Sequence, residues 1–338
     1  MEARLTQLLG KPVIKVTKLY GGASYRTFYR VFSQGDETFI LMAMPEGKMS
    51  VSEEITNLKE KPKELSYINV QRYLKSLGLP VPEIKLFSEE DRWIILNDLG
   101  DTKLWDTVKT AQPNDIKKWY KKALDLLVIL QNKTSKDIST SAHQHISTSC
   151  IAYQRSFDAT LFNWEFDHFL EYYFQLSAVS CQPSAEDKDI FIKETRKITQ
   201  ELCAMPQVFT HRDFQGSNLM VHNNQLTMTD FQDALLGPDV YDLVSLLRDS
   251  YFDVTDYLEE LLEYYGGQQG WHIKKLRRAF DLQTVQRKLK DSGRFVFIDH
   301  VKKNPDFLKF IPTSMGYVKQ ALARLPEYNG LYDLIKKY

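Results

Sequence analysis

The most constraining feature of the chain is the segment from His211 to Asp233, which reads HRDFQGSNLMVHNNQLTMTDFQD. It contains the pattern H-x-D-x-x-x-x-N, followed by a short apolar stretch, a polar turn at Asn223-Asn224 and a second apolar stretch. An aspartate, Asp230, comes directly after the second stretch. This order predicts a polar loop joined to a β-hairpin, with an acidic residue on each side of the hairpin.

Residues of these types in this order suit the transfer of a phosphoryl group. Such a transfer leaves the protein little covalent chemistry, so that catalysis consists of aiming an acceptor hydroxyl and holding Mg2+ against the phosphates. The kinase arrangement uses a loop aspartate as base, and an asparagine and a later aspartate as metal ligands. The pattern therefore predicts Asp213 as the catalytic base, Asn218 and Asp230 as metal ligands, and ATP and Mg2+ as cofactors. A coincidental surface loop before a hairpin is the plainer alternative.

The composition argues against several functional classes. The 338 residues carry 44 basic and 44 acidic side chains, and this balance gives no footprint for nucleic acid or a membrane surface. The three cysteines form neither a paired framework nor a close metal-type spacing. The longest aliphatic run, Leu126 to Leu130, is too short to cross a bilayer. We expect a cytoplasmic protein that binds a small-molecule substrate and ATP, without an obligate protein partner.

The pattern of secondary structure predicts two lobes. The first hundred residues contain β-rich stretches at 13–20, 27–32, 38–42 and 92–96, and one helix at 67–77 with Ser66 as a candidate cap. Beyond Gly100, long amphipathic helices are expected at 117–130, 160–174, 241–251, 256–264, 273–289 and near the C-terminus. We predict an α+β fold with a small β-rich, nucleotide-binding N-lobe at 1–97 and a larger, mainly helical C-lobe at 98–338. The C-lobe would hold the catalytic and substrate-binding residues, and the hinge should lie near 94–100.

These features resemble the aminoglycoside phosphotransferase-like superfamily, relatives of the protein kinases. Residues 230–249, with DFQDA, a Gly-Pro pair and YDLVSLLRD, look most like the bacterial kinases that phosphorylate N-acetylmuramate and N-acetylglucosamine in cell-wall recycling. Supporting matches are GASYR at 22–26 and LGD at 99–101. The resemblance implies a two-lobed protein-kinase-like fold and ATP-dependent phosphorylation of the anomeric hydroxyl of an amino sugar.

Nucleotide contacts are expected in the N-lobe and at the hinge, from Gly22, Ser24, Arg30, Asn97, Asp98 and Leu99. The loop 21–24 could cover the phosphates with backbone N–H groups, although a Gly-Gly pair after a strand is often only a turn. Protein kinases place a lysine on the third strand, whereas residues 38–44 contain none. Arg26, Arg30 and Lys48 are candidates for its role.

The candidate contacts to the acceptor are Glu165, Gln215 and Arg248. Glu165 could touch the sugar or belong to a solvated acidic face, and Arg248 could touch the substrate or form a buried ion pair. Gln215 lies in a loop interior where relatives often carry a basic residue, so the transition-state charge could be met differently. His211 and Asp242 are interpreted as structural residues, with Asp242 steadying the catalytic loop.

Two other functions stay open on the sequence alone. A kinase of an aminoglycoside, choline or homoserine is possible, and cationic acceptors usually demand an acidic or aromatic pocket. Glu165 and Asp167 leave this reading open. A pseudokinase that binds a nucleotide without catalysis would account for the missing strand lysine, but not for the intact Asp213, Asn218 and Asp230.

Overall fold

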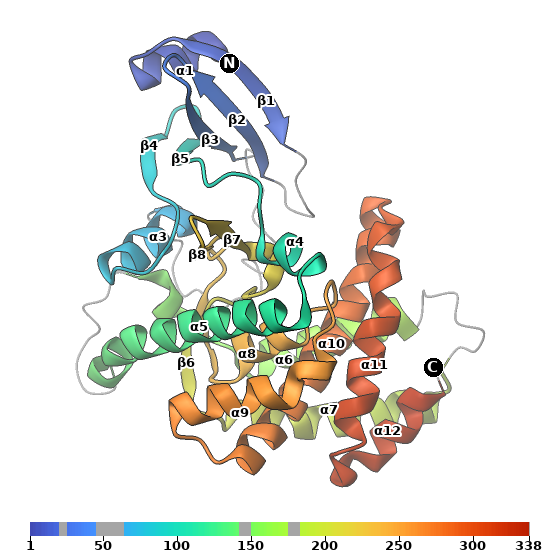
Figure 1. Cartoon of the computed structure of the whole chain (residues 1–338). Helices are drawn as coiled ribbons and strands as arrows, with labels where there is room; N and C mark the ends of the chain where they lie inside the picture. The colour runs from blue at the N-terminus through green and yellow to red at the C-terminus, as the bar shows by residue number, and fades with distance from the viewer. Residues whose placement is uncertain (20–25, 45–63, 142–149, 175–182, 338) are drawn as a thin grey trace.

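The computed structural model describes residues 1–19, 26–44, 64–141, 150–174 and 183–337 (Figure 1). The described residues form a β-rich N-lobe, at the top of Figure 1, and a larger helical C-lobe below it. The expected two-lobed α+β fold is confirmed. Gly22, Ser24 and Lys48, which were candidates for phosphate binding, lie outside the described residues.

A five-stranded antiparallel sheet forms the N-lobe, with the strand order β1-β2-β3-β5-β4. The strands are β1 (Val13–Leu19), β2 (Thr27–Ser33), β3 (Glu37–Ala43), β4 (Ile84–Ser88) and β5 (Trp93–Asn97). Because side chains alternate along a strand, Val31, Leu41 and Ile95 share one face, where they pack with Leu5 of helix α1 (Glu2–Leu9). Four strands agree with the sequence prediction within one residue, whereas α1 and the short edge strand β4 were not predicted.

Helix α3 (Ser66–Ser76) belongs to a second core cluster, together with the opposite face of the sheet. Met42 and Ile94 lie in the same buried cluster as the apolar stripe of this helix. Leu65 occupies the N-cap position and makes no side-chain cap bond. Ser66 is thus the first residue of the helix rather than its cap, which corrects the sequence prediction.

Helices dominate the C-lobe. They are α4 (Leu104–Lys109), α5 (Pro113–Ser141), α6 (Ala159–Phe169), α7 (Ala185–Cys203), α8 (Tyr241–Leu247), α9 (Leu258–Gln269), α10 (Ile273–Lys302), α11 (Ile311–Leu322) and α12 (Asn329–Lys336). A single π-helical turn, η2 (Leu170–Phe174), continues α6. No helix in the described part of the chain combines the length and apolar character that a bilayer crossing requires.

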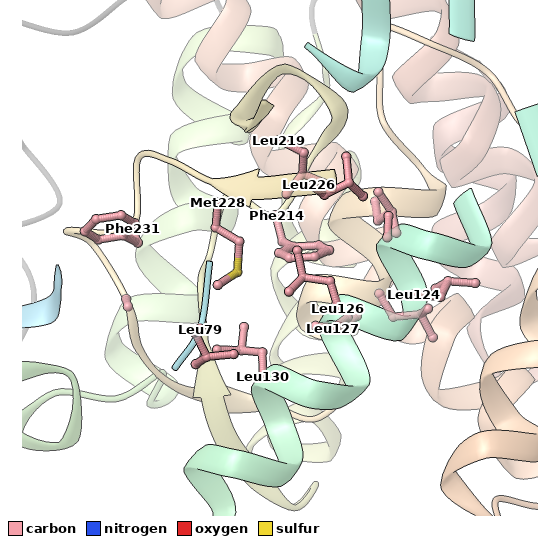
Figure 2. Packing of buried hydrophobic residues seen from close by; sticks show 14 of the residues in the cluster. Leu79, Leu124, Leu126, Leu127, Leu130, Phe214, Leu219, Leu226, Met228 and Phe231 are labelled. Atoms are coloured by element: carbon pink, nitrogen blue, oxygen red, sulfur yellow. The ribbon is translucent and has the colours of Figure 1, made fainter. Parts of the chain in front are cut away.

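Two short antiparallel strand pairs carry the residues of interest. They are β6 (Gln207–Thr210) with β9 (Leu235–Pro238), and β7 (Leu219–His222) with β8 (Gln225–Met228). The predicted hairpin is therefore present. Figure 2 shows side chains from this hairpin and its flanking loops beside the leucines of α5, with Leu219, Leu226, Met228, Phe214 and Phe231 labelled on the hairpin side. Phe214 and Phe231 are fully buried and directly follow Asp213 and Asp230. The packing of these two rings in the core therefore fixes the backbone at both aspartates.

The long helix α10 approaches α6 closely at Gly293. A Cβ atom at this position would lie 2.7 Å from the Cα atom of Phe169 and 3.0 Å from its nitrogen, which is closer than packed atoms allow. The sequence prediction ended this helix at Leu289, whereas α10 continues to Lys302, with Ser292 and Gly293 both buried. This close packing brings the middle of α10 beside the catalytic loop.

Candidate active site

The catalytic loop, residues 211–218, is held by the carboxylate of Asp242. This side chain, in the first turn of α8, accepts hydrogen bonds from the backbone N–H groups of His211 at 2.6 Å and of Arg212 at 2.9 Å. Arg212 has a φ of 75°, a left-handed conformation that is uncommon for a residue with a Cβ atom and is found at functional sites. The interpretation of Asp242 as a residue that steadies the loop is confirmed.

Glu165 of α6 anchors the same loop from the interior. Its side chain is fully buried, pairs with Arg212 at 3.2 Å and accepts a hydrogen bond from Gln286 at 2.6 Å. Although burial works against the charged form of Arg212, Glu165 raises the pKa of Arg212 above its ordinary value. This placement speaks against the expected sugar contact, because Glu165 has no exposed surface to offer a substrate.

Arg287 of α10 meets the carboxylate of Asp213. The distance from Nη2 of Arg287 to Oδ1 of Asp213 is 3.2 Å, and Nη1 donates to the carbonyl of Arg212 at 2.8 Å. Burial would raise the pKa of Asp213, but Arg287 and Lys290 outweigh it and hold this pKa below its usual value. Asp213 is therefore an ionised carboxylate at neutral pH, as a group that accepts a proton must be.

The β7–β8 pairing brings Asn218 and Asp230 to the same end of the hairpin. Asn218 precedes β7 and Asp230 follows β8, and the N–H of Thr229 donates to the carbonyl of Asn218 at 2.9 Å. The side-chain nitrogen of Asn218 donates to the carbonyl of Asp213 at 2.9 Å, so its side-chain oxygen is the atom that can bind a cation. The catalytic loop and the adjoining end of the β7–β8 hairpin thus bring together the three residues predicted from the sequence.

The donors suit Mg2+ but do not by themselves complete its coordination. An amide oxygen and a carboxylate are hard ligands of the kind that Mg2+ binds, usually with water and substrate phosphates in the other positions. The described residues contain no cluster of three or more His, Cys, Asp or Glu side chains that could hold a metal ion. A cation between Asn218 and Asp230 would therefore depend on the phosphates of a nucleotide.

Arg26, just before β2, reaches across to the same place from the N-lobe. Its Nη2 lies 2.8 Å from Oδ1 of Asp230, and its Nη1 donates to the side-chain oxygen of Gln232 at 2.7 Å. Its side chain is 14% exposed. Of Arg26 and Arg30, the two candidates for the role of the missing lysine that the structure describes, Arg26 is thus the one at the candidate metal site.

Arg30 has a different partner set. Its guanidinium pairs with Asp98 at 2.7 Å and with Asp101 at 2.8 Å, which ties β2 to the hinge. This placement speaks against the expected phosphate contact. The side-chain oxygen of Asn97 accepts from the backbone N–H of Glu83 at 2.6 Å. Half-buried Leu99 follows in the hinge.

Gln215 and Arg248 fall in different environments. Gln215 lies in the catalytic loop, where its side-chain nitrogen donates to Ser217 at 3.1 Å. Arg248 is fully buried, with its guanidinium carbon 4.6 Å from the ring centre of Tyr317 and one hydrogen bond to Thr255 at 3.2 Å. Burial argues against a substrate contact, and the described residues provide no ion pair for Arg248 either.

The geometry agrees with a sequence comparison. The model of the phosphotransferase enzyme family (APH) matches residues 15–277 of the chain. The chain belongs to this family. The phosphotransferase is 25% identical over 321 residues to the N-acetylmuramate/N-acetylglucosamine kinase of Pseudomonas aeruginosa, which covers 93% of this chain and 85% of that protein.

Solved structures share the fold of this phosphotransferase. The complex of APH(2″)-IIa with gentamicin superposes with a TM-score of 0.63 at 15% identity, over 93% of this chain and 94% of that one. LicA in complex with AMP gives a TM-score of 0.59 at 15% identity, over 97% of each chain. These likenesses confirm the predicted kinase-like fold, and they show that proteins with this fold bind nucleotides.

Arg287 is a residue of the candidate site that the sequence analysis missed. It lies in residues 283–288 of α10, all of which are buried. Only Val285 among them is apolar. Polar side chains on every face of a helix are unusual, because buried polar groups require partners. That pattern was the available signal, but it does not tell which loop the helix meets.

Proposed function

We propose that this phosphotransferase transfers the γ-phosphoryl group of ATP to the anomeric hydroxyl of an amino sugar in cell-wall recycling. N-acetylmuramate and N-acetylglucosamine are the proposed acceptors, which is supported by the name of the P. aeruginosa relative. The observation that carries the proposal is the contact of the Asp213 carboxylate with Arg287, in a loop that also presents Asn218 and lies at the end of the hairpin that Asp230 follows.

Asp213 is the proposed base. Its carboxylate would accept a hydrogen bond from the anomeric hydroxyl, orient the oxygen toward the γ-phosphorus and take the proton as the P–O bond forms. Arg287 contacts the carboxylate and disfavours its protonation before the substrate arrives. Asp242 and Glu165 keep the loop in its left-handed turn at Arg212, so that the base is positioned in advance.

Nucleotide binding is proposed for the N-lobe, residues 1–97, and for the hinge at 97–99. The backbone of the loop 21–24 would face the phosphates, and the C-lobe, residues 98–338, would supply the base and the sugar site. Asn218 and Asp230 would hold Mg2+, whose charge offsets that of the phosphates.

Arg26 is proposed to take the role of the lysine that protein kinases carry on the third strand. In the structure it neutralises Asp230. With Mg2+ held by this carboxylate, Nη2 of Arg26 would exchange Asp230 for a phosphate oxygen, while Nη1 would keep its hydrogen bond to Gln232. A planar guanidinium can contact two phosphate oxygens at once, which makes arginine an effective replacement for lysine.

The acceptor is tested by measuring ADP release with Mg-ATP against N-acetylmuramate, N-acetylglucosamine, glucosamine, choline, homoserine and kanamycin. We expect turnover with one or both N-acetylated amino sugars. Turnover with choline, homoserine or kanamycin alone would overturn the proposed acceptor while leaving the phosphotransferase assignment in place.

A further inference from the structure

Helix α8 and the residues just after it meet the catalytic loop through three polar side chains. Asp242, Ser245 and Asp249 are spaced by three and four residues, the spacing of one helix face. Asp249 lies two residues beyond the end of the helix at Leu247. The hydroxyl of Ser245 donates to the carbonyl of Arg212 at 3.2 Å. Because every residue of α8 is buried, this face is a rigid support for the loop.

Asp249 holds the second half of the loop. Its Oδ2 accepts a hydrogen bond from the backbone N–H of Gly216 at 3.1 Å, and its Oδ1 accepts one from the N–H of Tyr251 at 2.9 Å. Gly216 packs between this carboxylate and α4, since a Cβ atom on it would lie 3.4 Å from Oδ2 of Asp249 and from Cβ of Trp105. The loop is thus held at residues 211 and 212 by Asp242 and at residue 216 by Asp249.

The carboxylate of Asp249 is buried, and within the described residues it forms no ion pair. Burial raises the pKa of Asp249 to about 6, although the two backbone donors, Lys288 and Arg287 act against this shift. The group is therefore largely ionised at neutral pH, and the two backbone N–H groups are its hydrogen-bond partners. A buried carboxylate is costly unless its donors are well placed, which ties Asp249 closely to the N–H of Gly216.

Gly216 begins the short 3₁₀ turn η3 (Gly216–Asn218), which ends at the candidate metal ligand. The backbone N–H of Asn218 closes this turn by donating to the carbonyl of Gln215 at 2.9 Å. The side-chain nitrogen of Asn218 is bound to the carbonyl of Asp213, which fixes the direction of its side-chain oxygen. A displacement at Gly216 is therefore passed through one turn of backbone to the oxygen that can bind a cation.

We propose that Asp249 is a positioning residue for the metal ligand Asn218 and acts through the N–H of Gly216. This inference rests on the proposed function, because it takes Asn218 as a ligand of Mg2+. Asp242 supports the half of the loop that leads to the base, and Asp249 supports the half that leads to the metal ligand. Loss of the Asp249 contact therefore weakens metal binding and leaves the base Asp213 in place.

Asp249→Asn tests this role with a side chain of nearly the same shape. Its amide oxygen replaces one carboxylate oxygen, but its NH2 group meets the second backbone donor and cannot accept from it. The dissociation constant of Mn2+, used in place of Mg2+, is measured by EPR with a non-hydrolysable analogue of ATP and without sugar. This constant should rise by roughly 10- to 100-fold, as is typical when a group that orients a metal ligand is lost.

The Mg2+ dependence of the rate is a second readout, which a mere loss of stability would not change. Asp249→Asn should need roughly 10-fold more Mg2+ for half of its maximal rate, and high Mg2+ should restore most of kcat. Asp253→Asn is the matched control. Asp253 also accepts a backbone N–H, that of Thr255 at 2.8 Å, and within the described residues it has no hydrogen bond to the catalytic loop. The control should bind Mn2+ as the wild type does.

Unchanged Mn2+ binding by folded Asp249→Asn would overturn the positioning role alone. If Asp249→Asn does not fold, Asp249→Ser carries the same test, and loss of folding in both variants would overturn a role confined to the loop. A wild type that binds no Mn2+ with the nucleotide would overturn the proposed metal site together with this inference. A wild type that binds Mn2+ and phosphorylates neither sugar would overturn the proposed acceptor, while the comparison of Mn2+ binding still decides the role of Asp249.

Discussion

Arg26 and Asp230 form an ion pair between the two lobes, with Nη2 of Arg26 2.8 Å from Oδ1 of Asp230. The pair places a cation of the N-lobe at the candidate metal ligand, in a chain whose third strand has no lysine. Arg26 and a metal ion would compete for the same carboxylate oxygen. Nucleotide binding and the contact between the lobes are therefore expected to be coupled at this pair.

Replacement of Arg26 by glutamine should raise the KM for ATP and lower kcat/KM by about 100-fold, because a charged donor to the phosphates is lost. Arg26→Lys should recover part of the activity. Arg4→Gln removes an arginine of the N-lobe that pairs with Asp91 instead, and steady-state kinetics should show little change for it. A lower KM for Mg-ATP in Arg26→Gln than in the wild type would show instead that Arg26 merely competes with the metal.

Glu165→Gln should destabilise the protein by about 3–5 kcal/mol, because it leaves Arg212 buried without a charged partner. Urea unfolding measures this change. Asp167→Asn on the same helix is the control, since Asp167 is half exposed and its pair with Arg196 is worth less than about 1 kcal/mol. An unchanged stability of Glu165→Gln, combined with a raised KM for the sugar, would restore Glu165 as a substrate contact.

Arg287→Met should shift the acidic limb of the pH profile of kcat/KM toward higher pH. Arg287 is a main cause of the lowered pKa of Asp213, so its loss raises that pKa, and Asp213 then becomes protonated at a higher pH. The acidic limb of Arg287→Lys should lie between that of Arg287→Met and that of the wild type. Circular dichroism establishes that each variant is folded, and an acidic limb that stays in place in folded Arg287→Met would refute the role of Arg287.

His168 should make the folded state sensitive to acid. Because burial lowers its pKa in the folded state to about 4, the unfolded chain binds a proton that the folded protein does not bind below about pH 6.5. This contribution to stability is present at neutral pH and is lost as the pH falls toward 4. His168→Phe keeps a ring against Trp164 and Tyr172, the aromatic neighbours of His168, but does not titrate.

Between about pH 7.5 and pH 5, the wild type should therefore lose about 2 kcal/mol of unfolding free energy relative to His168→Phe. Urea denaturation at the two pH values gives this difference directly. Parallel losses in both proteins would mean that His168 is protonated as readily in the folded state as in the unfolded chain.

The parts that could be predicted from the sequence are those in which neighbours in the chain are neighbours in space. The catalytic loop, its hairpin and Asp230 lie within about twenty residues of one another, and the β-branched strands of the N-lobe have short connections. Local spacing alone was enough to place Asp213, Asn218 and Asp230 together.

The parts that could not be predicted depend on contacts between distant segments. The sequence pattern of α10 predicts a helix, but it does not reveal that Arg287 meets a loop 74 residues earlier in the chain. The sequence left Glu165 open between a sugar contact and a solvated acidic face, because its partner Arg212 lies on another element. Likewise, Arg30 binds the hinge because Asp98 and Asp101, which are distant in the sequence, lie beside its guanidinium.

The most direct test of the central claim is phosphorus NMR of the product formed from N-acetylmuramate and Mg-ATP by the wild type and by Asp213→Asn. The wild type should give a sugar phosphate whose phosphorus couples to the anomeric proton. Asp213→Asn should bind ATP as the wild type does and form no such product. A phosphate on another hydroxyl, or undiminished product formation by Asp213→Asn, would contradict the assignment of Asp213 as the base that directs transfer to the anomeric oxygen.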